Sequence, residues 1–284
     1  MRVSNRLCKF LPGPRLIFSL CLLCLITVVP KLSAQANDEF DSYKVRLGGF
    51  WTYSNPSGTF QGSSDTGSVD VQEDLGFNSY STFAGKLDWK FTHKNHLYVV
   101  GTAFNSDQQT VLKRTITFKG QTFEAGLTAH GSLNTPMYGF GYQYDIIRRR
   151  RGHLGLAAQI NLFDSHASIS TAAQTTSDGV QHPAMSASAS LLAPIPVAGP
   201  EFRLYLTNSP RVFVEGNVYG MYFFGYGNFV SSAGTLGLTL SKHVSVNAGY
   251  QLGSRLLVNN NSSSDRIGLN LTQKGPHVGV EFSF

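Results

Sequence analysis

Apolar and polar side chains alternate one by one along much of this chain, in stretches of about ten residues. Because successive side chains of a β-strand point to opposite faces, this alternation predicts strands and not helices. The stretches lie at residues 43–51, 83–91, 138–146, 154–162, 201–206, 212–218, 235–240, 244–255 and 277–284. A further strand is predicted at 97–105 from its β-propensity, although its two faces do not differ clearly. Beyond residue 34 no apolar run is long enough for a membrane helix.

The last eight residues show the pattern most clearly. One face carries Val278, Val280, Phe282 and Phe284, and the other carries His277, Gly279, Glu281 and Ser283. An apolar strand face left in water would favour aggregation. In a closed barrel that crosses a membrane the same pattern is stable, because lipid covers the apolar face and the lumen takes the polar one. The chain is therefore predicted to be all-β, folded as a closed antiparallel transmembrane β-barrel.

A final strand that ends on an aromatic residue resembles the terminal strand of bacterial outer-membrane β-barrel proteins, found in cell envelopes of the Gram-negative type. The resemblance implies that outer-membrane lipids surround the barrel. It also implies that the barrel-insertion machinery recognises the apolar face of the last strand, formed by Val278, Val280, Phe282 and Phe284. The acidic stretch 73–76, which follows 67–71, is similar to the segment before the second strand of uncharacterised small outer-membrane proteins. The resemblance covers the architecture and carries no functional motif.

The amino-terminal segment predicts export. Residues 1–15 carry four basic side chains and no acid, and residues 16–29 form an almost unbroken apolar run. Small residues at 33–34 then precede Gln35. A basic start, a short apolar core and a small-residue cleavage site are typical of a secretory signal peptide. Residues 1–34 are predicted to be a cleaved signal, and residues 35–284 to form the mature barrel.

Removing the predicted signal changes the composition arguments. All three cysteines precede residue 35, so the mature chain would contain no disulfide. Five of the 23 basic residues and none of the 17 acids also precede residue 35, which leaves 18 against 17 and a net charge of +1 instead of +6. The basic balance therefore gives no argument for binding nucleic acid. Charged residues make up only 14% of the chain, which argues against a soluble β-sandwich.

The connections between the predicted strands alternate between short and long. Short links lie at 93–95, 148–152, 207–210 and 241–242, and long polar links lie near 54–78, 108–134 and 166–195, with smaller ones near 225–233 and 259–266. Outer-membrane barrels place short turns and both termini in the periplasm and long loops outside the cell. Four short turns and two periplasmic termini predict ten strands, with eight or twelve left open. The long loops are expected to be extracellular, where they could contact a ligand.

Charged residues of both signs occupy the predicted inward face. The candidate lumen charges are Lys44, Arg46, Lys86, Asp88, Lys90, Asp145, Glu201, Arg203, Glu215, Arg255, His277 and Glu281. Paired charges would close the lumen and leave a protein with a structural or surface-interaction role. Unpaired charges around an open axis would instead form a small porin-like channel for ions or small solutes. The closed network is favoured, because acids and bases are nearly equal in number.

A membrane hydrolase is the third hypothesis. Asp164, Ser165 and His166 supply the residue types of a catalytic triad, but Ser165 is predicted to face away from the other two. The paired acidic motifs of omptin-type proteases are not found in the sequence. No histidine pair has a convincing metal-ligand spacing. We therefore predict no catalytic residue, metal site or cofactor, and we expect the arginine run 148–151 to be a solvated turn. The sequence does not predict an oligomeric state.

Overall fold

The computed structural model describes residues 40–61, 69–74, 76–103, 105–176, 179–209, 211–223, 227–259 and 268–284. These residues belong to one compact unit, residues 39–284. The predicted signal peptide, residues 1–34, lies outside the described residues. The described part of the chain contains no helix that is long and apolar enough to cross a membrane.

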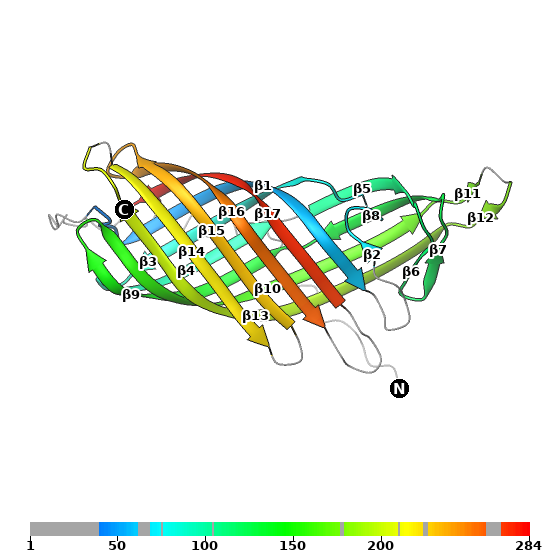
Figure 1. The fold of residues 1–284 in the computed structure, drawn as a ribbon, viewed down its shortest axis with the longest axis horizontal. Helices are drawn as coiled ribbons and strands as arrows, with labels where there is room; N and C mark the ends of the chain where they lie inside the picture. Colours follow the sequence, from blue (N-terminus) through cyan, green and yellow to red (C-terminus); the bar gives the residue numbers. More distant parts are fainter. Residues whose placement is uncertain are drawn as a thin grey trace, which may run out of the picture. The chain divides into compact units, whose positions relative to one another are not determined.

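Ten long antiparallel strands of the described chain close into a barrel (Figure 1). They are β1 (Val45–Gln61), β3 (Tyr80–Lys90), β4 (Asn95–Ala103), β9 (Met137–Arg149), β10 (Gly152–Thr171), β13 (Met185–Tyr205), β14 (Arg211–Phe223), β15 (Gly227–Thr239), β16 (Val244–Asn259) and β17 (Gly268–Ser283). Each strand pairs with the next in this order, and β17 pairs with β1. The predicted closed barrel of ten strands is confirmed, and the alternatives of eight and twelve strands are wrong.

The first and last strands complete the ring. The register of β1 and β17 sets Leu47 opposite Phe282 and Trp51 opposite Val278. Figure 1 shows β17 in red beside β1 in blue. Val278 and Phe282 are 48% and 40% exposed on the outer surface, whereas Glu281 is buried inside. The predicted assignment of the two faces of the last strand is therefore confirmed.

The two ends of the barrel differ in their connections. The turn end, as we name it, carries the short links 91–94, 150–151, 206–209 and 240–243, together with residues 40–44 and Phe284. The loop end carries the described parts of the longer connections, with the short strands β2 (Val69–Asp70), β5 (Asn105–Val111), β6 (Ile116–Phe118), β7 (Gln121–Phe123), β8 (Thr128–Asn134), β11 (Gln174–Thr175) and β12 (Gln181–His182).

Strands continue into the segments that the sequence predicted to be loops. Strand β1 runs to residue 61, and the ladder between β10 and β13 is continuous from Gly152 opposite Leu204 to Thr171 opposite Met185. Strands β5 and β8 pair with each other inside the predicted loop 108–134. This extra pairing satisfies backbone groups that a plain loop would leave to water.

The barrel carries apolar side chains outside and two different layers inside. Outward side chains such as Phe83, Leu192 and Leu252 are 70%, 69% and 66% exposed, as expected for a surface that faces lipid. The interior near the turn end contains buried charges. The interior near the loop end contains an apolar core, with Val69, Val71, Phe77, Leu112, Ile116, Phe118, Phe123, Ala129, Ile169, Ala187, Ile195, Val197, Phe229 and Leu271.

Segments from the long connections form much of the apolar core. The hairpin of β6 and β7 contributes Phe118 and Phe123, which are among the largest fully buried side chains. Its two-residue turn, Lys119 and Gly120, has φ angles of +50° and +76°. Positive φ at both turn positions is what a tight hairpin turn of this hand requires, and glycine adopts it without strain. This hairpin thus joins the same buried cluster as wall residues such as Val197.

Prolines interrupt one ladder of the barrel wall. Among the described residues, β13 and β14 pair at Ala198 and from Glu201 to Tyr205. Pro194, Pro196 and Pro200 stand at alternate positions of β13, and its ladder to β10 runs through all three without a break. Alternate residues of a strand direct their N–H groups toward the same neighbour. Because proline has no N–H, the neighbour deprived of donors is β14.

Candidate functional site

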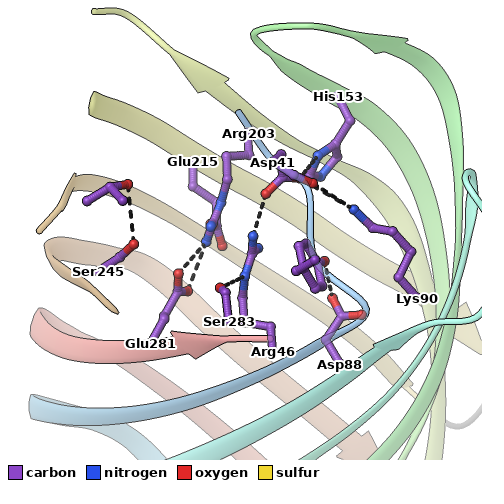
Figure 2. A network of polar contacts seen from close by, with 12 residues as sticks. Asp41, Arg46, Asp88, Lys90, His153, Arg203, Glu215, Ser245, Glu281 and Ser283 are labelled. Carbon is purple, nitrogen blue, oxygen red and sulfur yellow. Dashed lines mark hydrogen bonds and ion pairs between the residues drawn. The ribbon is translucent and has the colours of Figure 1, made fainter. Parts of the chain in front are cut away.

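The candidate site is the buried charge layer near the turn end, which we call the polar cluster. Figure 2 shows part of it, with side chains from several strands pointing toward one another. Its acids are Asp41, Asp88, Asp145, Glu201, Glu215 and Glu281, and its lysine and arginine bases are Arg46, Lys86, Lys90, Arg148 and Arg203. Tyr43, His96, His153 and Tyr219 complete it. Eight of the ten barrel strands and the segment before β1 supply these residues, because inward positions of a strand alternate with lipid-facing ones.

Asp41 enters the lumen from the segment before β1. Its carboxylate forms an ion pair with Arg46 and accepts a hydrogen bond at 2.9 Å from Nδ1 of His153. Its backbone carbonyl accepts hydrogen bonds from Nζ of Lys90 at 3.0 Å and from Arg148 at 2.9 Å. Figure 2 shows Asp41 between Arg46 on one side and His153 and Lys90 on the other. One short segment therefore ties β1, β3, β9 and β10 together across the turn end.

The charges around Asp41 also decide its protonation. Burial by itself would raise the pKa of the Asp41 carboxyl, but Arg46 and Lys90 and the hydrogen bond from His153 lower that pKa well below its usual value. The neighbouring Tyr43 behaves in the opposite way, because burial raises the pKa of its hydroxyl well above its usual value. Asp41 is therefore a carboxylate and Tyr43 a neutral phenol over the ordinary pH range.

Tyr43 supports two cations with its ring. The Arg46 guanidinium lies 3.7 Å and the Lys90 ammonium 3.8 Å from the ring centroid. The hydroxyl of Tyr43 donates a hydrogen bond of 3.0 Å to Asp88. Cation–π contacts of this kind are strongest where water is excluded, as it is around this buried ring. Tyr43 thus links the Asp41 contacts to the charges on β3.

His96 is fully buried between two carboxylates. Its Nδ1 lies 3.2 Å from Asp88, and its Nε2 lies 3.1 Å from Asp145. A carboxylate only accepts hydrogen bonds, and an imidazole donates from both nitrogens only when it is protonated. The geometry therefore calls for an imidazolium at His96. That charge would match the six acids of the cluster with six bases.

Arg203 forms the second centre of the cluster. Its guanidinium contacts Glu281 at 2.8 Å and also forms an ion pair with Glu215 (Figure 2). Glu215 lies opposite Arg203 on the neighbouring strand β14, whereas Glu281 belongs to β17, so the contact with Glu281 crosses the lumen. Its guanidinium carbon also lies 4.4 Å from the centroid of the Phe213 ring. A buried arginine that bridges two carboxylates satisfies more of its five donors than one pair would.

The remaining ion pair, Lys86 with Glu201, is long and more exposed to solvent than the ion pairs described above. Nζ of Lys86 lies 3.4 Å from Glu201, and 26% of the Lys86 side chain is exposed. Glu201 also accepts a hydrogen bond from the hydroxyl of Tyr219. A cavity of about 20 Å³ lies here, lined in part by Lys86, Glu201 and Arg203. That is room for about one water molecule among these side chains.

Most of the predicted lumen charges meet in the polar cluster. The structure brings together Arg46, Lys86, Asp88, Lys90, Asp145, Glu201, Arg203, Glu215 and Glu281. His277 lies apart, half-buried, with Nε2 3.0 Å from the hydroxyl of Thr235. Lys44 is exposed before β1, where the chain has not yet entered the strand and alternation does not apply.

Arg255 is also absent from the cluster, and a strand irregularity explains why. The ladder between β16 and β17 shifts register between Gln251 and Ser254. An extra residue in a strand moves every later side chain to the other face. Arg255 lies exposed opposite Thr272, which alternates with the buried Leu271. The prediction that Arg255 points into the lumen is corrected accordingly.

Several members of the cluster were not predicted as lumen residues. Asp41 precedes the first strand, so no alternation marks it. Tyr43 alternates in the sequence with Val45 and Leu47 on the same side, which predicts an apolar outer face, and Arg148 is predicted to lie in a solvated turn. His96 and His153 are the second residues of β4 and β10, and the sequence places them only next to short links. Arg148 in fact donates to Asp145 at 2.7 Å, and only 3% of its side chain is exposed.

The residues of the hydrolase hypothesis are described and do not form a triad. His166 lies 3.5 Å from Asp164, and both side chains are largely exposed. Ser165 is buried on the opposite face of β10, as the alternation predicted. Among the described residues no group of three or more His, Cys, Asp or Glu side chains is placed to hold a metal ion.

Comparisons with known proteins identify the fold. No protein-family model matches the chain, and no curated protein matches it. Among solved structures, the outer membrane protease OmpT of Escherichia coli superposes with a TM-score of 0.51 at 13% identity, covering 87% of this chain and 100% of OmpT. The transport unit of the E. coli autotransporter AIDA-I gives a TM-score of 0.43 at 10% identity, over 94% of this chain and 97% of that one. The attachment invasion locus protein Ail of Yersinia pestis gives 0.33 at 9% identity, over 85% and 99%.

These identities show a shared fold and nothing finer. The chain has the β-barrel fold of bacterial outer-membrane proteins, as its last strand predicted. OmpT is a protease, and a shared fold at 13% identity does not transfer that activity to this chain. The fold alone therefore does not decide the activity of this chain.

Proposed function

We propose that this protein is an integral outer-membrane β-barrel with a sealed lumen, and that its role is structural or is carried out by its surfaces. The observation that carries the proposal is the filling of the interior by two different layers. The polar cluster fills the lumen near the turn end, and the apolar core fills it near the loop end. A solute that entered at one end would meet the second layer after passing the first.

The pairing within the polar cluster supports closure over conduction. Each carboxylate of the cluster contacts a base or a hydroxyl, and each base contacts a carboxylate or a carbonyl. Charges that conduct ions are instead arranged around an open axis, where ions exchange with water. Buried charges that are paired cost much less than unpaired ones, so the closed arrangement is the stable one.

The apolar core supports the same conclusion. It combines side chains of the connections, such as Phe118 and Phe123, with side chains of the barrel wall, such as Val197. Apolar packing at the loop end excludes water from the lumen. The second candidate function is a small porin-like channel. It would require both the polar cluster and the apolar core to open.

The proposal includes an orientation and a set of contacts. The turn end would face the periplasm with both termini, and the loop end would face the exterior. The connections of the loop end would then be available to an extracellular ligand. The apolar face of β17, with Val278 and Phe282 exposed, would serve the barrel-insertion machinery during assembly. We propose no enzymatic activity, since Ser165 lies buried away from Asp164 and His166.

Single-channel recording in planar bilayers tests the proposal. The mature chain, residues 35–284, is refolded, and its folding is verified by the heat-dependent shift in gel mobility that closed barrels show. We expect the folded wild type to be silent. A double variant that weakens both layers, Asp41→Ala with Phe118→Ala, is expected to give intermittent conductance. Steady current steps from the folded wild type would refute the sealed lumen and favour the porin-like channel.

A further inference from the structure

The outer surface of the turn end is strongly basic. Its described segments carry Lys44, Lys94, Arg149, Arg150, Arg151, Arg211 and Lys242, which we call the turn-end basic surface. The one acidic side chain in the described turn-end segments is Asp41, which is buried and points into the lumen. Among the described turn-end residues, basic side chains therefore outnumber acidic ones, and most of the basic side chains are exposed.

This excess is confined to the turn end. After residue 34 the chain has 18 basic residues and 17 acids, so it is almost neutral as a whole. The polar cluster balances its own charges, as described above. The described loop end mixes signs, with exposed Glu73, Asp107 and Glu124 among Lys113 and Lys274. A basic surface at one end of a neutral protein indicates a negatively charged partner at that end.

The basic surface borders directly on the outer apolar surface. Phe91 and Leu240, which are 43% and 60% exposed, stand just before Lys94 and Lys242 in the chain. Nζ of Lys94 lies 5.9 Å from the ring centroid of Tyr144, whose side chain is 42% exposed. Long basic side chains next to an apolar belt place their charges at the level of lipid headgroups. A partner at this border must therefore combine negative charge with an adjoining apolar part.

We propose that the turn-end basic surface binds the headgroups of anionic phospholipids in the leaflet that faces it. The inference rests on the proposed function, because it needs the barrel to lie in a membrane. An anionic phospholipid supplies a phosphate for the basic surface and acyl chains for the apolar belt at the same position. A soluble acidic protein or polymer would supply the charge alone and would leave the adjoining belt unused.

The two tryptophans of the chain allow a local measurement. Trp89 is 51% exposed near the turn end, and Trp51 is 37% exposed farther along the barrel wall. In the Trp51→Phe variant only Trp89 reports, and brominated lipids quench a tryptophan that they contact. The refolded mature chain is placed in vesicles of phosphatidylcholine, to which brominated phosphatidylglycerol or brominated phosphatidylcholine is added. We expect the anionic lipid to bind roughly fivefold more strongly than the neutral lipid at Trp89. This is the factor expected when one basic side chain contacts an anionic headgroup.

Matched variants show whether the basic surface causes the preference. The variant K44Q/K94Q/R149Q/K242Q removes four charges from the turn end and is expected to abolish the preference at Trp89. The variant K113Q/K119Q/R255Q/K274Q removes four basic charges from the loop end and is expected to retain it. Added salt should weaken the preference, because these charges are exposed. The Trp89→Phe variant, in which Trp51 reports, should show a smaller preference.

The failure of this inference can be told apart from failure of the proposed function. If both brominated lipids quench Trp89 equally, the barrel lies in the membrane but the basic surface does not select anionic lipid, and the inference is overturned. If the turn-end variant keeps the preference, the inference is overturned as well. If neither lipid quenches Trp89 in a chain that shows the heat-dependent mobility shift, the membrane location itself is refuted.

Discussion

The polar cluster and the apolar core fill the same barrel by opposite physical means. The polar cluster closes its part of the lumen through paired charges, such as Arg203 with Glu215 and Glu281. The apolar core closes its part through the packing of side chains such as Phe118 and Phe123. The same alternation along the strands supports both layers, because the inward position accepts either a charge with a partner or an apolar group with neighbours.

The apolar core and the polar cluster therefore tolerate different kinds of substitution. An apolar core loses stability in proportion to the volume removed, and volume-conserving replacements cost little. A network of buried charges depends on each partner, because a charge that loses its partner stays in a medium that cannot solvate it. The polar cluster should therefore respond to single charge changes and to pH, whereas the apolar core should respond to size and be insensitive to pH.

The largest effect is expected for Arg203→Ala. Its removal leaves Glu215 and Glu281 close together without their shared cation, and breaking a buried pair in this way costs about 3–5 kcal/mol. The free energy of unfolding, measured by urea titration of the refolded barrel in micelles, should fall by that amount. Arg255→Gln is the matched control, because Arg255 is exposed and outside the cluster. Equal losses in the two variants would contradict the account of the cluster.

A loss of about 3–4 kcal/mol is expected for Phe123→Ala in the apolar core. Phe123 is fully buried, so the truncation leaves a cavity that its neighbours fill only in part. The same urea titration should show this loss at pH 7 and unchanged at pH 4. Phe123→Leu, which keeps most of the volume, serves as the control and should lose much less. A strong pH dependence of the Phe123→Ala effect would show that the two layers are coupled.

An intermediate, pH-dependent effect is expected for Asp41→Asn. The pKa of Asp41 is lowered in the folded state, so its carboxylate stabilises the fold fully above the unfolded pKa near 4. That stabilisation is lost as the pH falls from there through the folded pKa. At pH 7 the variant should be less stable than the wild type by about 1–3 kcal/mol. The difference should shrink progressively below pH 4, and a difference that stays constant would rule out Asp41 as the titrating group.

The smallest effect is expected for Lys86→Gln. The Lys86 side chain is partly exposed, its contact with Glu201 is 3.4 Å long, and Glu201 keeps the hydrogen bond from Tyr219. The loss of stability should therefore be about 1 kcal/mol or less. The double variant Lys86→Gln with Tyr219→Phe removes both partners of Glu201 and should lose more than the two single variants together. If the loss of stability in the double variant equals the sum of the losses in the two single variants, Glu201 does not depend on keeping one of these two partners.

The sequence predicted the barrel well because strand alternation is a local signal. Each residue from 277 to 283 of β17 could be assigned to its face without any knowledge of its neighbours, and the lengths of the links were sufficient for the number of strands. The interior was predicted less completely, because it depends on segments that have no period. Asp41 enters the lumen from outside a strand, and Phe118 and Phe123 enter it from a connection. Arg255 was misplaced because one irregularity in β16 reversed the faces beyond it.

The prolines of β13 bear on how many such barrels can share a crowded membrane. An unpaired strand edge with regularly spaced N–H groups is a template to which another chain can add a strand. Pro194 and Pro196 remove two successive donors from the side of β13 where pairing with β14 stops. This edge of β13 therefore offers acceptors without the matching donors, so it is a poorer template for an added strand than an uninterrupted edge would be.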